Sequence, residues 1–370
     1  MRALYPEFAQ GAYDYSLLFF GLAKRLLAPK GRYGLIGPTA LLSDDKPWQR
    51  IMHEQFRPRA LLCFPMGAFG ARVRTTAFVG ARGACENVDV LDEAGARTLH
   101  TWRDGPWFET ATGGPRVEAA RTLGDVAEVF AGCATGAAYD LAPLVGDCPG
   151  ALRKGTGTIS SNSAEIEPVP LVTTGALDRF FCTWGKRTIR FLGRDYARPV
   201  WPQAGPRAVM AALTRQRRPK ILVGGLTSVL EAWFDEKGSA AGVVSTWVIA
   251  PKAGVDPWLV LALLNSATMS RLYFSRHGAK SMSGMQTTIY KRGLLQLPWP
   301  EIGASEAARL GEIARVLQGA YSEDSDRELH RIAARVLGRS EAEAEADITW
   351  WRARAMKRRN PQSGNALSEC

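Results

Sequence analysis

The chain has 370 residues, of which 46% are hydrophobic and 22% charged, and its formal net charge is +11. This composition excludes a disordered tail and a small disulfide-rich protein, and it leaves room for two or three folded domains. The longest apolar stretches, residues 16–23 and 258–264, fall well short of the roughly 20 residues of a membrane-spanning helix, and no secretory signal is present, so we expect a soluble, cytoplasmic protein.

Residues 1–85 alternate between helix and strand patterns. A first helix, which Asp14 can cap and which Pro29 and Gly31 end, has apolar residues at steps of three and four: Leu18, Phe19, Leu22 and Leu26. A strand at 33–36, a helix at 43–55 and strands at 60–64 and 73–79 follow. This order is typical of the closing half of an open α/β sheet. Such a half presents an apolar edge that needs earlier strands to pack against it. We expect these missing strands to precede Met1 in the sequence.

From residue 86 to 300, short β-rich pieces are separated by glycine and proline, which predicts an α+β arrangement. The clearest elements are strands at 220–224 and 243–249 and a helix at 257–272 that Asp256 caps. Beyond Pro300 the sequence predicts helices at 306–318 and 326–337, and an end from Trp350 that we expect to fray. The predicted domains are 1–85, 86–300 and a helical tail at 301–370.

The positive charge is concentrated in two parts of the chain. Residues 1–85 carry 12 basic and 5 acidic side chains, and residues 181–300 carry 17 and 5. Residues 86–180 are acidic, with 7 basic and 14 acidic side chains, and residues 301–370 are nearly balanced. A basic excess favours a polyanionic partner such as nucleic acid, although a pI near 9.5 is equally compatible with a protein that has no such partner.

No residue pattern indicates a reaction. The six cysteines and four histidines form no zinc-type ligand pair, so we assign no metal and no disulfide and expect the cysteines to be small core residues. Residues 130–136 contain glycines but lack the order of a dinucleotide loop, which favours a structural turn or a DNA-facing loop over the cofactor loop of a small-molecule transferase. Asp235-Glu236-Lys237 could supply nuclease carboxylates, but before Gly238 it is more simply a solvated hairpin turn.

Basic and aromatic residues alternate between Arg179 and Arg190. In a strand, this alternation would place Lys186, Arg187 and Arg190 on one face, where they suit phosphate contact over a packed core. An ordinary half-buried strand with a charged outer face fits equally well. Further basic side chains occur at 215–220 and in a polar stretch at 271–292, of a composition that often carries recognition.

Two early stretches resemble the segment that follows the catalytic Asn-Pro-Pro-Tyr motif in N6-adenine DNA methyltransferases of type II or IIG-like restriction-modification systems: Asp14-Tyr-Ser-Leu-Leu-Phe-Phe20 and Leu26 to Pro38. Four later stretches resemble the TaqI-like target-recognition domain of the same enzymes: 219–223, 232–238, 263–266 and 289–300. These stretches occur in the order of the family and span roughly residues 1–300.

The resemblance implies S-adenosylmethionine as the methyl donor and double-stranded DNA, with a flipped-out adenine, as the partner. It also implies the C-terminal half of a Rossmann-like methyltransferase sheet at 1–85, followed by the α+β DNA target-recognition domain. The chain has no Pro-Pro and no Phe-x-Gly-x-Gly cofactor loop, and both precede the matching segment in the family. We therefore expect the downstream part of such an enzyme, from a truncated gene, a split subunit or a decayed copy, which binds no cofactor and is inactive alone. The expected protein partner is an upstream methyltransferase half or a fused nuclease.

The resemblance places Phe69 against the flipped adenine, and the alternative is a core phenylalanine beneath a hairpin. The expected DNA contacts are Arg72, Arg74, Thr135, Lys186, Arg187, Arg190, Lys220, Arg276, Lys280 and Gln286. We assign no catalytic, cofactor-binding or metal-binding residue. The alternative function is a stand-alone DNA-binding specificity protein without a catalytic partner.

Overall fold

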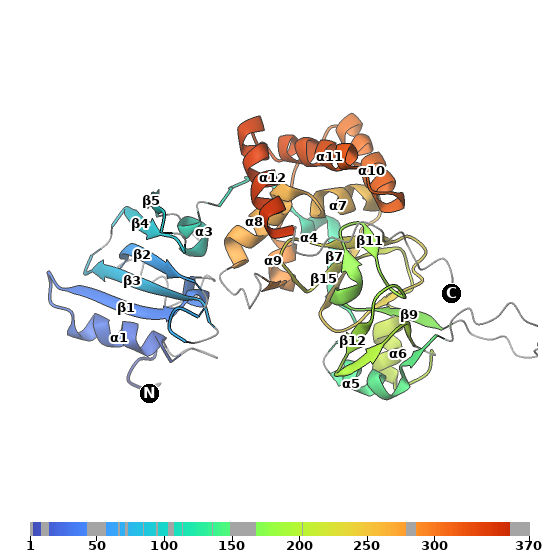
Figure 1. The fold of residues 1–370 in the computed structure, drawn as a ribbon, viewed down its shortest axis with the longest axis horizontal. Coiled ribbons are helices and arrows are strands. Elements are labelled where there is room, and N and C mark those ends of the chain that lie inside the picture. Colours follow the sequence, from blue (N-terminus) through green and yellow to red (C-terminus); the bar gives the residue numbers. More distant parts are fainter. Residues whose placement is uncertain are drawn as a thin grey trace, which may run out of the picture. The chain divides into compact units, whose positions relative to one another are not determined.

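The computed structural model describes most of the chain and divides it into two units (Figure 1). The described residues are 3–8, 15–42, 57–65, 67–70, 73–83, 85–93, 95–102, 107–112, 114–134, 136–148, 168–201, 203–278 and 286–355. Unit 1 comprises residues 1–116 and 272–287, and unit 2 comprises residues 117–271 and 288–370. Within the described ranges, no helix has the length and apolar character needed to cross a membrane.

Unit 1 is built on a five-stranded sheet with the strand order β1-β3-β2-β4-β5. These strands are β1 (Arg32–Pro38), β2 (Pro58–Phe64), β3 (Thr75–Ala81), β4 (Asn87–Leu91) and β5 (Arg97–Thr101). Because β3 lies between β1 and β2 and is antiparallel to both, β1 and β2 run parallel and need a crossover connection. The three strands predicted before residue 85 are confirmed. The domain boundary predicted at 85 is not, because β4 pairs with β2 and β5 with β4.

Helix α1 (Leu17–Leu26) packs one face on this sheet and exposes the other. On the buried face, the ring of Phe20 meets that of Phe78 edge-on, with centroids 5.2 Å apart. The predicted helix is confirmed. Of the four apolar residues that recur at steps of three and four, Leu18 is buried and three are exposed: Phe19, Leu22 and Leu26. The helix is apolar on both sides, so periodicity alone does not show which side meets the sheet. Asp14 and the helix predicted at 43–55 lie outside the described residues.

Unit 1 has three further helical elements among the described residues. They are η1 (Thr39–Leu42), α3 (Trp107–Ala111) and the last residues of α8 (Ala267–His277). Trp107 is fully buried and lies 5.2 Å from the ring of Trp102, measured between centroids. A Cβ at Gly114 would lie 2.2 Å from the Cβ of Ser275, so glycine is required where residues 114–116 pass α8.

Unit 2 contains two four-stranded sheets (Figure 1). One has the order β17-β15-β19-β7, formed by β7 (Ala127–Ala131), β15 (Lys220–Gly224), β17 (Ala232–Asp235) and β19 (Thr246–Pro251). The other has the order β18-β9-β14-β8, formed by β8 (Gly146–Asp147), β9 (Val169–Val172), β14 (Pro199–Trp201) and β18 (Ala241–Gly242). The mixed α/β architecture expected from the sequence is thus observed.

Short elements connect these sheets. The two-residue and three-residue strands are β6 (Arg121–Thr122), β10 (Leu177–Asp178), β11 (Phe181–Cys182), β12 (Ile189–Phe191), β13 (Arg194–Tyr196), β16 (Leu226–Thr227), β20 (Thr287–Thr288) and β21 (Pro298–Trp299). The short helices are α4 (Leu123–Val126), α5 (Gly136–Leu141), η2 (Ala142–Leu144), η3 (Thr174–Ala176), α6 (Arg207–Thr214) and α9 (Lys291–Leu295). The amide of Gln216 connects the end of α6 to β18, because it donates to the Ala212 C=O and binds both the N–H and the C=O of Gly242.

The stretches that resemble a target-recognition domain form the buried framework of unit 2. The Asn265 amide accepts from the Ala232 N–H at 3.0 Å and donates to the Ala232 C=O at 2.9 Å. The Gln318 amide binds Phe234 in the same way, at 3.1 and 2.8 Å. Together the two amides take the place of a neighbouring strand along the outer edge of β17, so its backbone groups are satisfied without one.

The helix predicted at 257–272 is interrupted at these framework residues. It is divided into α7 (Pro257–Leu264) and α8, and the break falls at Asn265 and Ser266. The hydroxyl of Ser266 donates to the Leu263 C=O at 2.7 Å and accepts from the Met269 N–H at 3.2 Å, so it caps the start of α8. A hydrophobic run of this length predicts one helix. The structure divides it because the Asn265 side chain binds Ala232 of β17 and the Ser266 hydroxyl caps the second helix.

The predicted helical tail is an integral part of unit 2. It consists of α10 (Ala304–Gly319), α11 (Glu323–Val336) and α12 (Glu341–Ala355). The carboxylate of Asp347, completely buried, accepts from Thr268 at 2.8 Å and from Arg271 at 2.6 Å. The expectation that the chain frays from Trp350 is wrong up to Ala355, because Trp351 is buried and holds α12 in place.

Candidate nucleic-acid interface

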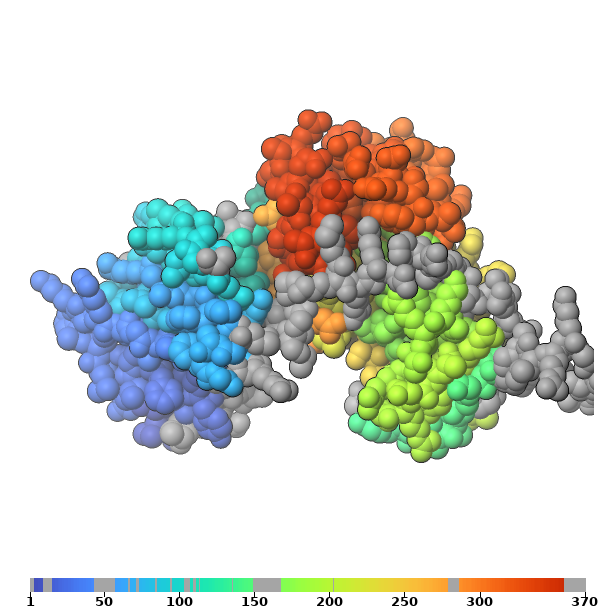
Figure 2. Space-filling model, viewed as in Figure 1, coloured from blue at the N-terminus to red at the C-terminus, as the bar shows by residue number. Residues whose placement is uncertain are grey.

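The strongest local charge of the chain lies in residues 181–219. This segment carries nine basic side chains and a single acidic one, Asp195. Its central element is the hairpin of β12 and β13, in which Arg190 is opposite Asp195. Leu192 and Gly193 at its tip have φ values of 44° and 87°, the combination of a two-residue type I′ turn. This part of unit 2 is yellow-green on the face shown in Figure 2.

The hairpin is anchored by side chains on its inner face. Ile189 is buried in the cluster that contains Trp184, and Phe191 and Tyr196 are buried in the cluster around α6. Arg190, between the two buried residues of β12, is exposed. The predicted alternation of basic and buried residues is therefore confirmed at 189–191.

The alternation does not extend over the whole stretch from Arg179. The chain changes direction at Phe180 and Gly185, which have φ values of 65° and 76°. As a result, Arg179 turns away from the hairpin and makes a buried ion pair with Asp326 at 2.7 Å. A single continuous strand was the wrong geometry for this stretch, because positive φ values bend the backbone out of the extended form.

Three of the nine cations of the segment pair with a carboxylate. Arg187 lies 3.6 Å from Asp178. Arg215 and Arg218 share Glu128, at 3.7 and 2.7 Å. By contrast, within the part of the chain that the structure describes, no carboxylate lies within ion-pair distance of Arg190 or Arg194 at the hairpin tip. The tip therefore holds two exposed cations that are available to an external anion.

Lys220 is wrong as a predicted DNA contact, because its side chain is completely buried. Its Nζ lies 2.5 Å from Oδ2 of Asp235, and burial lowers the pKa of the Lys220 ammonium. The same carboxylate accepts from the backbone N–H groups of Ser239 and Ala240. The predicted turn after β17 is present, but Asp235 is buried within it and not solvated. The sequence, which places Lys220 beside three arginines, gave no sign that it turns inward.

Phe69 lies in unit 1, in the connection between β2 and β3, and its side chain is 54% exposed. Gly67 and Gly70 flank it with φ values of 88° and 72°, and its ring meets Phe64 edge-on at a centroid distance of 5.1 Å. The alternative of a core phenylalanine is therefore wrong. Its contact with a flipped adenine stays a prediction.

The other predicted contacts are dispersed. Arg74 is partly buried and pairs with Glu93 at 3.1 Å, which favours a structural role. Arg276, in the last turn of α8, and Gln286, just before β20, are half-buried in unit 1. The remaining three lie outside the described residues: Arg72, Thr135 and Lys280.

The glycine-containing loop after β7 packs against β18. A Cβ on Gly132 would lie 2.3 Å from the carbonyl oxygen of Gly242, and Cys133 forms a bridge with Val243. Glycine is therefore required at position 132, because the backbone of β18 approaches it closely. This close packing favours the interpretation of the loop as a structural turn. This loop offers no described feature that fits a cofactor.

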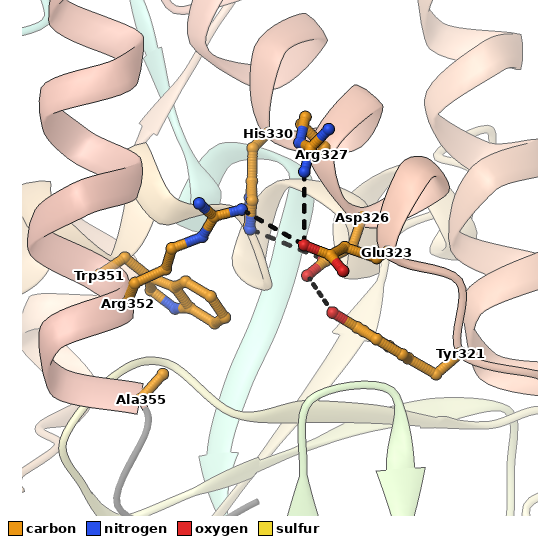
Figure 3. Close-up of a pocket in the computed structure, with 8 residues that line it drawn as sticks. All are labelled: Tyr321, Glu323, Asp326, Arg327, His330, Trp351, Arg352 and Ala355. Carbon is orange, nitrogen blue, oxygen red and sulfur yellow. Dashed lines mark hydrogen bonds and ion pairs between the residues drawn. The ribbon is translucent and has the colours of Figure 1, made fainter. Parts of the chain in front are cut away.

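A pocket of about 230 Å³ lies between α11 and α12 (Figure 3). Asp326 accepts there from the hydroxyl of Tyr321 at 3.2 Å and from Arg179. Glu323 pairs with Arg327 at 3.3 Å and with Arg352 at 3.9 Å. Since its charged groups neutralise one another, the pocket is an ion-pair network between helices, and we assign no ligand to it.

No metal centre is evident in the described ranges, where no three His, Cys, Asp or Glu side chains converge. Two cysteines, Cys133 and Cys182, are buried, and burial raises the pKa of their thiols to about 11 and about 12. These thiols are protonated at neutral pH and unsuited to nucleophilic attack. They behave as the small core residues expected from the sequence.

No family model and no curated protein matches the sequence. The type IIL restriction-modification enzyme MmeI, solved in complex with DNA, resembles the chain with a TM-score of 0.55 and 11% identity, over 96% of this chain and 54% of that one. The type IIG restriction endonuclease BpuSI gives a TM-score of 0.39 at 11% identity, over 95% of this chain and 50% of that one. The chain thus spans about half the length of these structures. The first likeness shows a fold shared with a restriction-modification enzyme.

Proposed function

We propose that the chain recognises a double-stranded DNA target as part of a restriction-modification or related defence system. The observation that carries this proposal is the hairpin of β12 and β13, in the most basic segment of the chain, whose exposed Arg190 and Arg194 have no carboxylate partner among the described residues. The fold shared with MmeI supports it. Phosphate contacts supply most of the affinity in such an interface, and base contacts supply the choice of sequence.

Salt dependence tests this proposal. Binding of the full chain to mixed-sequence duplex should weaken with salt, because each neutralised phosphate releases about 0.9 counterion. Replacing Lys186, Arg187 and Arg190 with glutamate should flatten the slope of log K against log salt by about 2 to 3. The matched control replaces Arg309, Arg327 and Arg331 on α10 and α11 with glutamate, which changes the net charge equally. Equal flattening in both variants would mean that only net charge matters.

For unit 1, we propose the closing half of the sheet of an adenine-specific, S-adenosylmethionine-dependent methyltransferase. Two observations support this. First, β1 and β2 run parallel and therefore need a crossover connection, and the antiparallel strand β3 lies between them. Second, Ile36 and Val79 are exposed on the face of the sheet opposite α1, although sheets built on such crossovers are normally covered on both faces. The specificity for adenine rests on the sequence resemblance alone.

The residues of this chain do not fit S-adenosylmethionine by themselves. No Phe-x-Gly-x-Gly loop is present in the sequence, and the one candidate loop uses Gly132 for packing. The methyl donor would be held by a second half that also carries Asn-Pro-Pro-Tyr. In that assembly, the exposed ring of Phe69 would contact the adenine extruded from the duplex.

Methyl transfer tests the role of unit 1. The full chain, given labelled S-adenosylmethionine and mixed-sequence DNA, should transfer no methyl group, and co-expression with a half that carries Asn-Pro-Pro-Tyr should restore transfer. Phe69→Ala should then lower the rate without lowering the melting temperature, because the side chain is exposed. Turnover by the pure chain would contradict this assignment. DNA binding without any restored transfer would favour the alternative, a stand-alone specificity protein.

A further inference from the structure

The tip of the β12–β13 hairpin is rigid. Both strands are fixed by buried side chains, and Leu192 packs part of its side chain against the cluster around α6. Leu192 also adopts a left-handed conformation, with φ of 44°, which is uncommon for residues other than glycine and persists only where the surrounding packing requires it. A rigid support of this kind holds side chains in the fixed positions that recognition needs.

The same tip projects from the core. Apart from its two chain neighbours, no described residue has a heavy atom within 4 Å of the position that a Cβ on Gly193 would occupy, and Gly193, Arg194 and Asp195 are all exposed. A two-stranded ribbon is narrow enough to enter the major groove of B-form DNA, which is about 12 Å wide. The element therefore has the dimensions of a groove reader.

The charges at the tip suit base edges better than phosphates. Arg190 and Arg194 have no carboxylate partner among the described residues, so their guanidinium groups can make bidentate contacts with guanine O6 and N7. Asp195 is the one acidic side chain among nine basic ones in residues 181–219, and it is exposed. A carboxylate at this place repels phosphate, whereas it can accept from cytosine N4 or orient Arg190 across the strand pair.

We infer that the β12–β13 hairpin reads base edges in the major groove and that Arg190, Arg194 and Asp195 select the target sequence. The inference rests on the proposed DNA-binding function and adds the reading element and its side chains. Lys186, in the turn before β12, would serve as a phosphate contact that positions the hairpin without choosing a sequence.

Selection from a random-sequence duplex pool at fixed salt tests the inference with the full chain. Arg190→Ala and Arg194→Ala should each lower discrimination at one position of the selected motif by about 5- to 150-fold, the range for one bidentate base contact. Asp195→Asn should strengthen binding to unselected duplex and weaken discrimination, because it removes the repulsive charge together with the acceptor. The control, Lys186→Ala, should weaken all sequences equally and keep the motif.

Three outcomes separate this inference from the function on which it rests. If the native chain binds duplex but selects no motif, or if the hairpin variants keep the motif unchanged, the inference is wrong while DNA binding stands. If the native chain does not bind duplex at all, the proposed function fails and the inference fails with it. Melting temperatures equal to that of the native chain show that each exposed variant is folded.

Discussion

The two units finish the edges of their sheets in different ways. In unit 2, the edge strand β17 is covered by the amides of Asn265 and Gln318. In unit 1, the edge strand β1 pairs with a described strand on one side only. Of the large hydrophobic side chains that are exposed in the described ranges, ten belong to unit 1 and four to unit 2, although unit 2 is the longer. The described part of unit 2 covers this edge with its own side chains, whereas unit 1 has an apolar surface suited to further polypeptide.

The difference shows how a protein can close a sheet without another strand. Side-chain amides carry both a donor and an acceptor, so a pair of them satisfies the backbone groups of an edge strand. A bare edge with apolar residues beside it is a template for pairing with another strand. In unit 1, Ile36 of β1 is 57% exposed, and no other strand among the described residues pairs with the outer edge of β1.

If the two units are independent, a substitution in one should not destabilise the other, and the largest such loss of stability is expected at Asp347. Asp347→Ala leaves Arg271 and Arg339 without the buried carboxylate that they share, which should lower the free energy of unfolding of unit 2 by about 3 to 5 kcal/mol. Native-state hydrogen exchange should show faster exchange in α8 and α12 and unchanged exchange in β1 to β3. Glu345→Ala, at an exposed ion pair with Arg331, is the control and should change little. Equal acceleration in both units would show that they do not unfold separately.

The two sides of α1 provide a second comparison. Phe20 is buried and Phe19 is 60% exposed. Phe20→Ala should lower the free energy of unfolding of unit 1 by about 3 to 5 kcal/mol, whereas Phe19→Ala should change it by no more than about 0.5 kcal/mol. Urea denaturation followed by exchange of the β3 amides measures both. A large loss for Phe19→Ala would mean that this side of α1 is covered in solution.

The smallest of these effects concerns the start of α12. The Ser340 hydroxyl and the Glu343 carboxylate form a reciprocal cap, in which Glu343 Oε2 accepts from the Ser340 N–H at 2.9 Å. Ser340→Ala should destabilise unit 2 by about 1 kcal/mol, measured from the urea midpoint. Backbone and hydroxyl donors of Ser340 lower the pKa of Glu343. The hydroxyl bond that Ser340 donates to the Glu343 carboxylate contributes at neutral pH and is lost as the pH falls through that lowered pKa, whereas the bond from the Glu343 N–H to the Ser340 hydroxyl remains. A midpoint difference that does not shrink at all in acid would contradict this account.

Local patterns predicted the elements better than their surroundings. The strands at 33–36 and 60–64 and the helices beyond residue 300 follow from apolar periodicity and from turn residues. Periodicity could not decide which side of α1 meets the sheet, since both sides are apolar. It also could not reveal that Asn265 interrupts a hydrophobic run, because the partner of its amide, Ala232, lies 33 residues away in the sequence.

The candidate site was predictable in part for the same reason. Residue type and alternation located Arg190 on an exposed face, as the structure shows. Lys220 could not be separated from the neighbouring arginines, because its burial depends on Asp235, to which it pairs across β15 and β17. Arg194 and Asp195 became candidates only once the hairpin turn at Leu192 and Gly193 was known. Charge patterns identify the segment, and backbone geometry identifies the reading residues.

Hydrogen–deuterium exchange of the full chain with and without duplex DNA tests the central claim most directly. The account predicts that duplex slows exchange at residues 186–198, the turn and hairpin that carry the exposed cations. Exchange in α10 and α11, whose cations are paired with glutamates, should not change. Binding that leaves residues 186–198 unprotected, or that protects α10 and α11 in their place, would contradict the account.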